Sequence, residues 1–127
     1  MITKITHITL FVNDLAESLA FYQSIGFKIH TDAAYGEMRW LTLCMPMQLD
    51  VELVLIHAQT DEEKALVGKQ AGNHPFLSLE SSDIYNDFTK LKQNGVTILE
   101  EPADQSWGIS AMIQDPNGTK IYICQPK

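Results

Sequence analysis

The side chains of this sequence best suited to chemistry are His7, Glu52 and His74. Each falls in a predicted strand, where successive side chains point to opposite faces of the sheet. Alternation places all three on the faces that the regular apolar residues do not occupy. Two imidazoles and a carboxylate in one concavity form a 2-His-1-carboxylate set, which suits a divalent metal ion with open positions for substrate or water. The alternative is that each is an isolated polar residue on a solvated strand face.

The elements that must position these residues occur twice in the chain. The first half predicts a strand over 5–12, a helix capped by Asp14 and ended by Gly26, and strands over 27–31, 38–45 and 50–56. The second half predicts a strand from His74, a helix capped by Ser81 or Ser82 and ended by Asn94-Gly95, and strands over 96–99, 107–114 and 119–124, interrupted by Pro102 and by the turn 115–118.

The repetition predicts the fold class. His7 and His74 are separated by the same number of residues as Phe21 and Phe88, which indicates an α+β protein of two pseudo-symmetric βαβββ modules. We expect one domain over 1–127, with module one at 1–57, a connection with a short helix at 58–73, and module two at 74–127. Each curved, mixed sheet would be covered on one face by its helix, and the uncovered faces would form a cleft.

Composition excludes several kinds of partner. The net charge is −7, with Arg39 as the one arginine, so the basic footprint of nucleic-acid binding is missing. No apolar run reaches membrane-spanning length, and the N-terminus lacks the regions of a signal peptide. Two distant cysteines suggest no disulfide framework. The expected protein is cytoplasmic, with neither a nucleic acid nor a membrane as partner.

Several motifs together resemble the vicinal oxygen chelate superfamily, which includes glyoxalase I, bleomycin-resistance and fosfomycin-resistance proteins and extradiol dioxygenases. The motifs that carry the resemblance are His7 through Val12, Asp14-Leu15, Ser18, Phe21-Tyr22, Gly26-Phe27 and Asp115-Pro116-Asn117-Gly118. The resemblance implies paired βαβββ modules, usually in a homodimer whose clefts take modules from one chain or from two. It also implies metal ligands at four positions, of which His7, Glu52 and His74 occupy three.

The sequence departs from that family at the fourth ligand position and at two glutathione positions. Tyr122 replaces the final glutamate, and a phenol with a pKa of about 10 is a poor ligand at neutral pH. Tyr122 would instead donate a hydrogen bond to a ligand oxygen or pack in the cleft wall. Phe11 and Ile56 replace the arginine and asparagine that hold glutathione in many glyoxalase I enzymes. With Phe76, they predict an apolar or aromatic ligand and no dependence on glutathione.

Arg39 and Trp107 have more than one interpretation, whereas His30 and His57 have one. Arg39 would clamp an anionic group, or lie at the surface or pair with an acid. Trp107 would stack on a ligand near the cleft mouth, or pack in the core or an interface. His30 and His57 lie at predicted strand ends, where we expect solvated histidines.

Three alternative functions are consistent with these observations. The first two involve a small molecule, and the third does not. The first is a divalent-metal-dependent, glyoxalase-like lyase or isomerase that uses zinc, nickel, manganese or iron, with Glu52 moving a proton. The alternative is a metal-free binding protein that resembles bleomycin-resistance proteins and sequesters a cationic, partly aromatic compound. The third hypothesis is a stand-alone interaction domain with a vestigial cleft. The substrate is left open.

Overall fold

The computed structural model describes all of residues 1–127 and divides the chain into two compact units, Met1–Val67 and Gly68–Lys127. The division falls within the connection predicted between the two modules.

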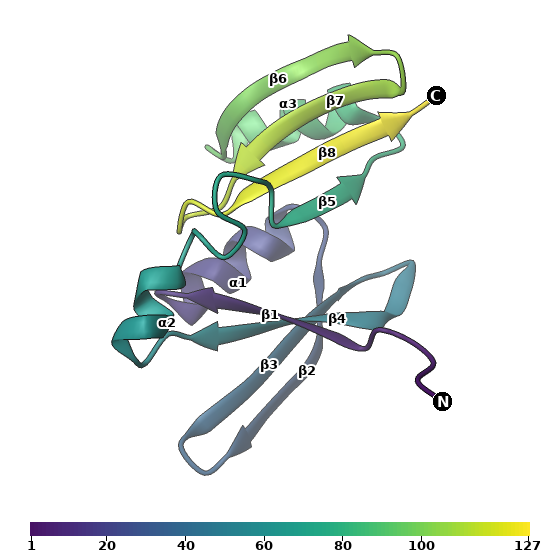
Figure 1. The fold of residues 1–127 in the computed structure, drawn as a ribbon. Coiled ribbons are helices and arrows are strands. Elements are labelled where there is room, and N and C mark those ends of the chain that lie inside the picture. The colour runs from purple at the N-terminus through teal and green to yellow at the C-terminus, as the bar shows by residue number, and fades with distance from the viewer. The chain divides into compact units, whose positions relative to one another are not determined.

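The first unit is a four-stranded mixed sheet with two helices (Figure 1). Its elements are β1 (His7–Val12), α1 (Leu15–Ser24), β2 (Lys28–Tyr35), β3 (Met38–Met45), β4 (Gln48–His57) and α2 (Asp61–Leu66). The strand order is β1-β4-β3-β2, with β1 parallel to β4 and the other pairs antiparallel. Asp14 caps α1 by accepting a hydrogen bond from the Glu17 amide at 3.0 Å, as its position in the sequence predicts.

The second unit repeats this order. Its elements are β5 (Leu77–Glu80), α3 (Ile84–Gln93), β6 (Thr97–Gln105), β7 (Gly108–Gln114) and β8 (Lys120–Pro126). The strand order is β5-β8-β7-β6, with β5 parallel to β8. The prediction of two βαβββ modules in an α+β fold is therefore confirmed, and the short helix predicted in the connection is α2.

One face of each sheet forms the core of its unit. In the first unit Leu10, Leu41 and Leu55 are fully buried, as are Tyr22 and Ser18 of α1. Burial of each such leucine contributes about 2 kcal/mol. Since alternate residues of β4 point the other way, the side chains of Glu52 and Ile56 lie on the face that α1 does not cover.

The second unit is built in the same way around Ile113 and Ile121. These residues lie opposite each other on β7 and β8. Ile84, Phe88 and Leu91 form the buried stripe of α3, as the helical spacing predicts.

Three details of the second unit differ from the sequence prediction. The strand predicted from His74 begins at Leu77, and His74 lies in a bend. The cap of α3 is Asp83, which accepts from the Asn86 amide, while the Ser81 hydroxyl donates to Asp87. Ser81 and Ser82 were reasonable candidates by residue type, but aspartate is an equally good cap.

The prediction that Pro102 interrupts the strands of the second half is wrong. Pro102 lies inside β6, where the pairing with β7 shifts register between Glu100 and Ala103. Because β6 is an edge strand, a proline there can lack an amide proton without breaking a ladder on both sides.

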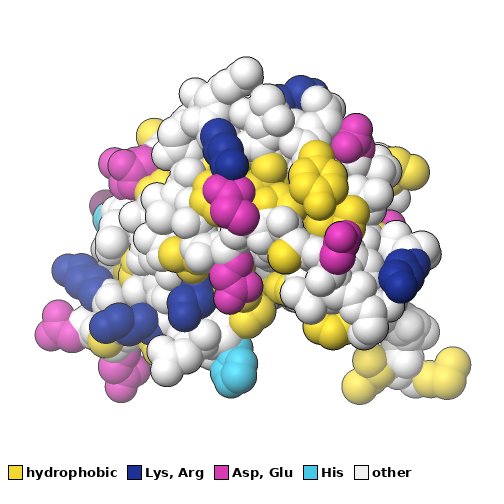
Figure 2. All heavy atoms as spheres, turned by 90° about the horizontal axis from the view of Figure 1, so that it is seen from above, with side chains coloured by type: hydrophobic (Ala, Val, Ile, Leu, Met, Phe, Trp, Pro, Cys, Tyr) yellow, Lys and Arg dark blue, Asp and Glu magenta, His cyan; other side chains and the backbone are white.

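Charged and apolar side chains are interspersed on the face shown in Figure 2, where single acidic and basic side chains surround exposed apolar ones. None of the helices has the length and apolar character needed to cross a membrane.

Candidate functional site

Glu52 is the centre of a polar cluster on the open face of the first sheet. It lies on β4 directly opposite His7 of the parallel strand β1. His7 Nε2 is 3.1 Å from Glu52 Oε2. The sequence-based prediction that these two side chains share a face therefore agrees with their geometry.

The other carboxylate oxygen of Glu52 is held from the opposite side of the strand. The Thr42 hydroxyl on β3 donates to Oε1 at 2.7 Å, and His30 Nδ1 on β2 lies 3.0 Å from the same oxygen. His30 reaches across β3 because Thr42 is small and because the pairing of β2 shifts register between Ile29 and Thr31. From the sequence we expected His30 to be solvated, and its contact with Glu52 was not predicted.

A signal for His30 was present in the sequence. Strict alternation from Lys28 places His30 on the face shared with Thr42, and in the structure Lys28 pairs with Cys44, two residues further along that face. The contact to Glu52 also needs the strand order β4-β3-β2, which alternation does not provide.

The cluster explains how a carboxylate is tolerated on this face. The Glu52 side chain is only 14% exposed, and a partly buried carboxylate needs hydrogen-bond donors. Four strands supply the group: Glu52 from β4, the Thr42 hydroxyl from β3, and the imidazoles of His7 and His30 from β1 and β2. The result is a fixed acceptor beside two imidazoles.

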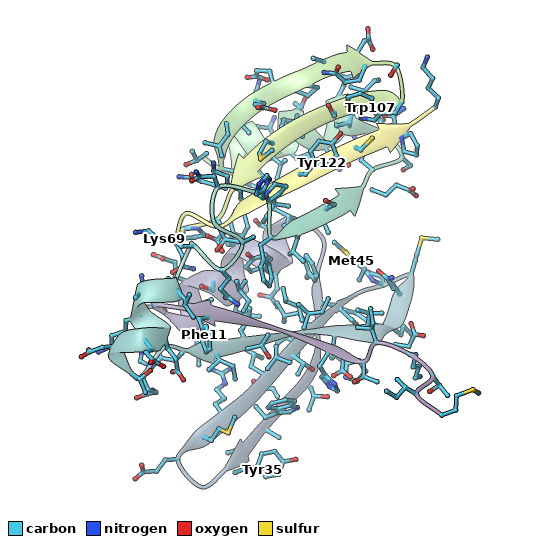
Figure 3. All side chains as sticks on the ribbon, in the orientation of Figure 1. Phe11, Tyr35, Met45, Lys69, Trp107 and Tyr122 are labelled. Atoms are coloured by element: carbon cyan, nitrogen blue, oxygen red, sulfur yellow. The ribbon has the colours of Figure 1, made fainter.

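A row of apolar side chains lies next to this polar cluster. Phe11 pairs with Ile56, and the pairing of Leu41 with Leu55 places Trp40 beside Ile56 on the same face. All three are half-buried. The ring centroids of Trp40 and His7 are 5.7 Å apart, so the apolar row and the polar cluster are in contact. Figure 3 labels Phe11 on β1.

The predicted metal set is not assembled within either unit. His7 and Glu52 meet in the first unit, whereas His74 belongs to the second and is exposed in a bend ahead of β5. Nowhere in the chain do three or more His, Cys, Asp or Glu side chains form a group that could hold a metal ion. Oε1 of Glu52 already accepts from the Thr42 hydroxyl. Neither unit by itself assembles the predicted set, and the metal-ligand role of His7, Glu52 and His74 stays a prediction.

Tyr122 is engaged with Trp107 in the second unit. The indole Nε1 of Trp107 donates to the Tyr122 hydroxyl at 2.8 Å, and both residues are labelled in Figure 3. This bond leaves the phenolic proton of Tyr122 free for an acceptor. Beside Tyr122 is a hollow of about 220 Å³ that Ser78 and Cys124 also line. Trp107 is 56% exposed, and Phe76 is half-buried just ahead of β5.

Arg39 lies on the opposite face from Glu52. It forms two parallel hydrogen bonds to Asp32, with Nε 3.0 Å from Oδ1 and Nη2 2.8 Å from Oδ2. These bonds lower the pKa of Asp32 from its ordinary value and raise that of Arg39. Of the two interpretations from sequence, the geometry shows the pairing with an acid, and a ligand role remains a prediction.

The fold and the open-face cluster together define a class: paired βαβββ units whose uncovered sheet faces carry polar and aromatic side chains. Residues 4–123 match the Glyoxalase/Bleomycin resistance protein/Dioxygenase superfamily. The chain belongs to this superfamily, as its motifs predict.

Three known proteins illustrate the relationship. An uncharacterised protein of Shewanella frigidimarina is 31% identical over 96% of this chain and 93% of its own length. The lactoylglutathione lyase of Neisseria meningitidis serogroup B is 26% identical over 98% of this chain and 91% of its own. The crystal structure of TnmS3, an antibiotic binding protein from Streptomyces sp. CB03234, is similar with a TM-score of 0.80, at 27% identity over 99% of this chain and 98% of the other.

Proposed function

We propose that this protein binds a small, partly aromatic molecule on the open face of the first sheet and sequesters it unchanged. One observation carries the proposal: the apolar row of Phe11, Ile56 and Trp40 adjoins the polar cluster around Glu52. A flat apolar surface beside a fixed carboxylate suits a guest that has an aromatic body and a hydrogen-bonding or cationic substituent.

The spacing of the two features fits such a guest. Neighbouring side chains on one face of a strand are about 7 Å apart, roughly the width of an aromatic ring and its substituent. The rings of Trp40 and His7 are in contact at 5.7 Å, so a ring placed on Trp40 would lie within reach of the Glu52 carboxylate. The net charge of −7 favours a cationic guest.

Two comparisons support sequestration. TnmS3, which is described as an antibiotic binding protein, is 27% identical over nearly the whole chain. In addition, Phe11 and Ile56 replace charged or amide side chains at the positions where glutathione is held in many glyoxalase I enzymes. A dicarboxylate tripeptide would lose about 1.5–3 kcal/mol for each missing charge-assisted bond.

The test is a titration of tryptophan fluorescence with bleomycin and with polycyclic aromatic antibiotics that do or do not carry an amine. We expect saturable quenching by an amine-bearing compound, followed by stoichiometric recovery of the unmodified compound by mass spectrometry. Glu52→Gln should weaken this binding at least about tenfold. Glu62→Gln, which changes an exposed glutamate of α2, should not. Chemical conversion of the guest, or equal affinities of the two variants, would contradict the proposal.

A metal-dependent lyase or isomerase is the second candidate function. It is favoured by the 3.1 Å separation of His7 Nε2 and Glu52 Oε2 and by 26% identity with a lactoylglutathione lyase. His74, from this chain or from a second copy, would have to complete the donor set, with Glu52 moving a proton. Metal analysis of protein purified without chelator tests whether a metal ion is bound. Thermal shifts with zinc, nickel, manganese and iron test whether such an ion stabilises the protein. A shift that His7→Ala and His74→Ala each abolish would favour the enzyme over sequestration.

We also propose that the protein forms a homodimer and that it is located in the cytoplasm. Light scattering on the purified protein measures the first, and fractionation of cells measures the second.

A further inference from the structure

A hollow in the first unit lies at one end of its sheet, away from Glu52. It has a volume of about 470 Å³ and is formed by residues of β3, β4, α1 and α2 and by the segments next to them. The side chains that matter here are Arg39, His57, Glu63, Leu15, Met38 and Ile56. Only Ile56 also belongs to the apolar row described above.

Arg39 supplies hydrogen-bond donors that the protein does not use. Asp32 accepts from Nε and from one N–H of Nη2. A guanidinium has five N–H groups, and the other three have no acceptor in the protein. Because Asp32 fixes the plane of the guanidinium, little side-chain freedom would be lost when a ligand binds to it.

His57 supplies one more donor beside Arg39. The Gln59 side-chain amide nitrogen lies 3.0 Å from His57 Nδ1, and an amide nitrogen only donates. Nδ1 therefore accepts, which leaves the proton of the neutral imidazole on Nε2. No protein acceptor is assigned to Nε2, so this N–H is available to a ligand.

The rest of the hollow restricts what could bind to these donors. Leu15, Met38 and Ile56 are apolar and only partly covered. Glu37 also lines the hollow, and Glu63 accepts from the Gln59 backbone amide through Oε1 at 2.9 Å, which holds a second negative charge at the rim. A doubly charged phosphate would be repelled by that carboxylate, whereas a single carboxylate with an apolar body would meet donors on one side and apolar surface on the other.

We propose that this hollow is a binding site for a small monocarboxylate with an apolar body, whose carboxylate is held by Arg39 and His57. The site is independent of the sequestration proposed for the Glu52 face. Its cation is Arg39, for which the sequence offered the clamping of an anionic group as one alternative.

The experiment titrates the ¹⁵N-labelled protein with 3-phenylpropionate and follows the amide resonances of 37–39 and 56–59. The matched neutral probe is 3-phenylpropionamide, and the charge-reversed probe is 2-phenylethylamine. We expect saturable shifts at these residues with the carboxylate, at least about tenfold weaker binding of the amide, and no saturation with the amine.

Three variants separate a built site from general charge attraction. Arg39→Gln should weaken 3-phenylpropionate binding at least about tenfold. Lys28→Gln removes an exposed cation of β2 that does not line the hollow, and it should change this binding less than about twofold. Glu63→Gln should strengthen binding because a like charge is removed. This third variant keeps the proposal testable if Arg39→Gln unfolds the protein.

The proposal is overturned by any of the following results. These are the absence of saturable shifts in the hollow, equal affinities for the carboxylate and the amide, and equal losses in Arg39→Gln and Lys28→Gln. Weaker binding in Glu63→Gln would also overturn it.

Discussion

Replacing Thr42 by valine removes one hydroxyl from a fully buried position and leaves the side-chain volume nearly unchanged. That hydroxyl donates to Glu52 Oε1 at 2.7 Å. A hydrogen bond to a charged acceptor contributes about 1.5–3 kcal/mol, and the added methyl group returns about 0.8 kcal/mol of apolar burial. Glu52 keeps His7 and His30 as partners. We therefore expect the free energy of unfolding to fall by about 1–2 kcal/mol.

The measurement is urea unfolding of the wild type, Thr42→Val and Thr42→Ser. Thr42→Ser keeps the hydroxyl and loses a methyl group, which costs about 1 kcal/mol. The two variants are therefore similar in stability but differ in the Glu52 contact. Only Thr42→Val should also weaken binding of an amine-bearing aromatic guest, because the carboxylate loses the bond that fixes it.

A double-mutant cycle with Glu52→Ala isolates the contact itself. If Thr42 acts through Glu52, the cycle gives a coupling of about 1–2 kcal/mol. Additivity within about 0.5 kcal/mol would refute the reasoning, because it would mean that the two side chains contribute independently.

Two further predictions concern a close backbone contact and an ion pair. Gly68→Ala should lower the free energy of unfolding by well over the about 1 kcal/mol expected for Gly72→Ala, measured by urea unfolding. Both have φ near +70°, but only at Gly68 would a Cβ lie 2.1 Å from the Asn117 carbonyl oxygen, and equal losses would contradict this contact. The Asp32–Arg39 pair holds the pKa of Asp32 below its ordinary value of 3.8, so its stabilisation is present above that value and is lost as the pH falls through the lower folded-state pKa. Asp32→Asn should remove this acid-dependent loss from thermal unfolding curves between neutral pH and pH about 2, and an unchanged pH profile would show that the exposed pair contributes nothing.

Much of the fold could be predicted because its determinants are local. Residues that alternate between two faces, such as Leu10 and Phe11, indicate a strand from the local sequence alone. The position of the α1 cap at Asp14 follows from the residue type and its spacing from Glu17. The second copy of the pattern then implies a second unit of the same order.

The candidate site was predicted in part. His7 and Glu52 could be placed on one face by alternation, and they lie 3.1 Å apart. The position of Tyr122 was known, but its bond to Trp107, fifteen residues away in the chain, was not. That bond depends on how β7 and β8 pair, which is a non-local property.

The sequence by itself determined the family and the two βαβββ units and placed His7 and Glu52 on one face, because these depend on local period and on motifs. Only the tertiary structure decided which polar side chains are partners. His30 and Glu52 meet because β3 alone separates their strands and because Thr42 of β3 contacts the same carboxylate. Strand order and register set such distances, and both arise from pairing between residues far apart in the chain.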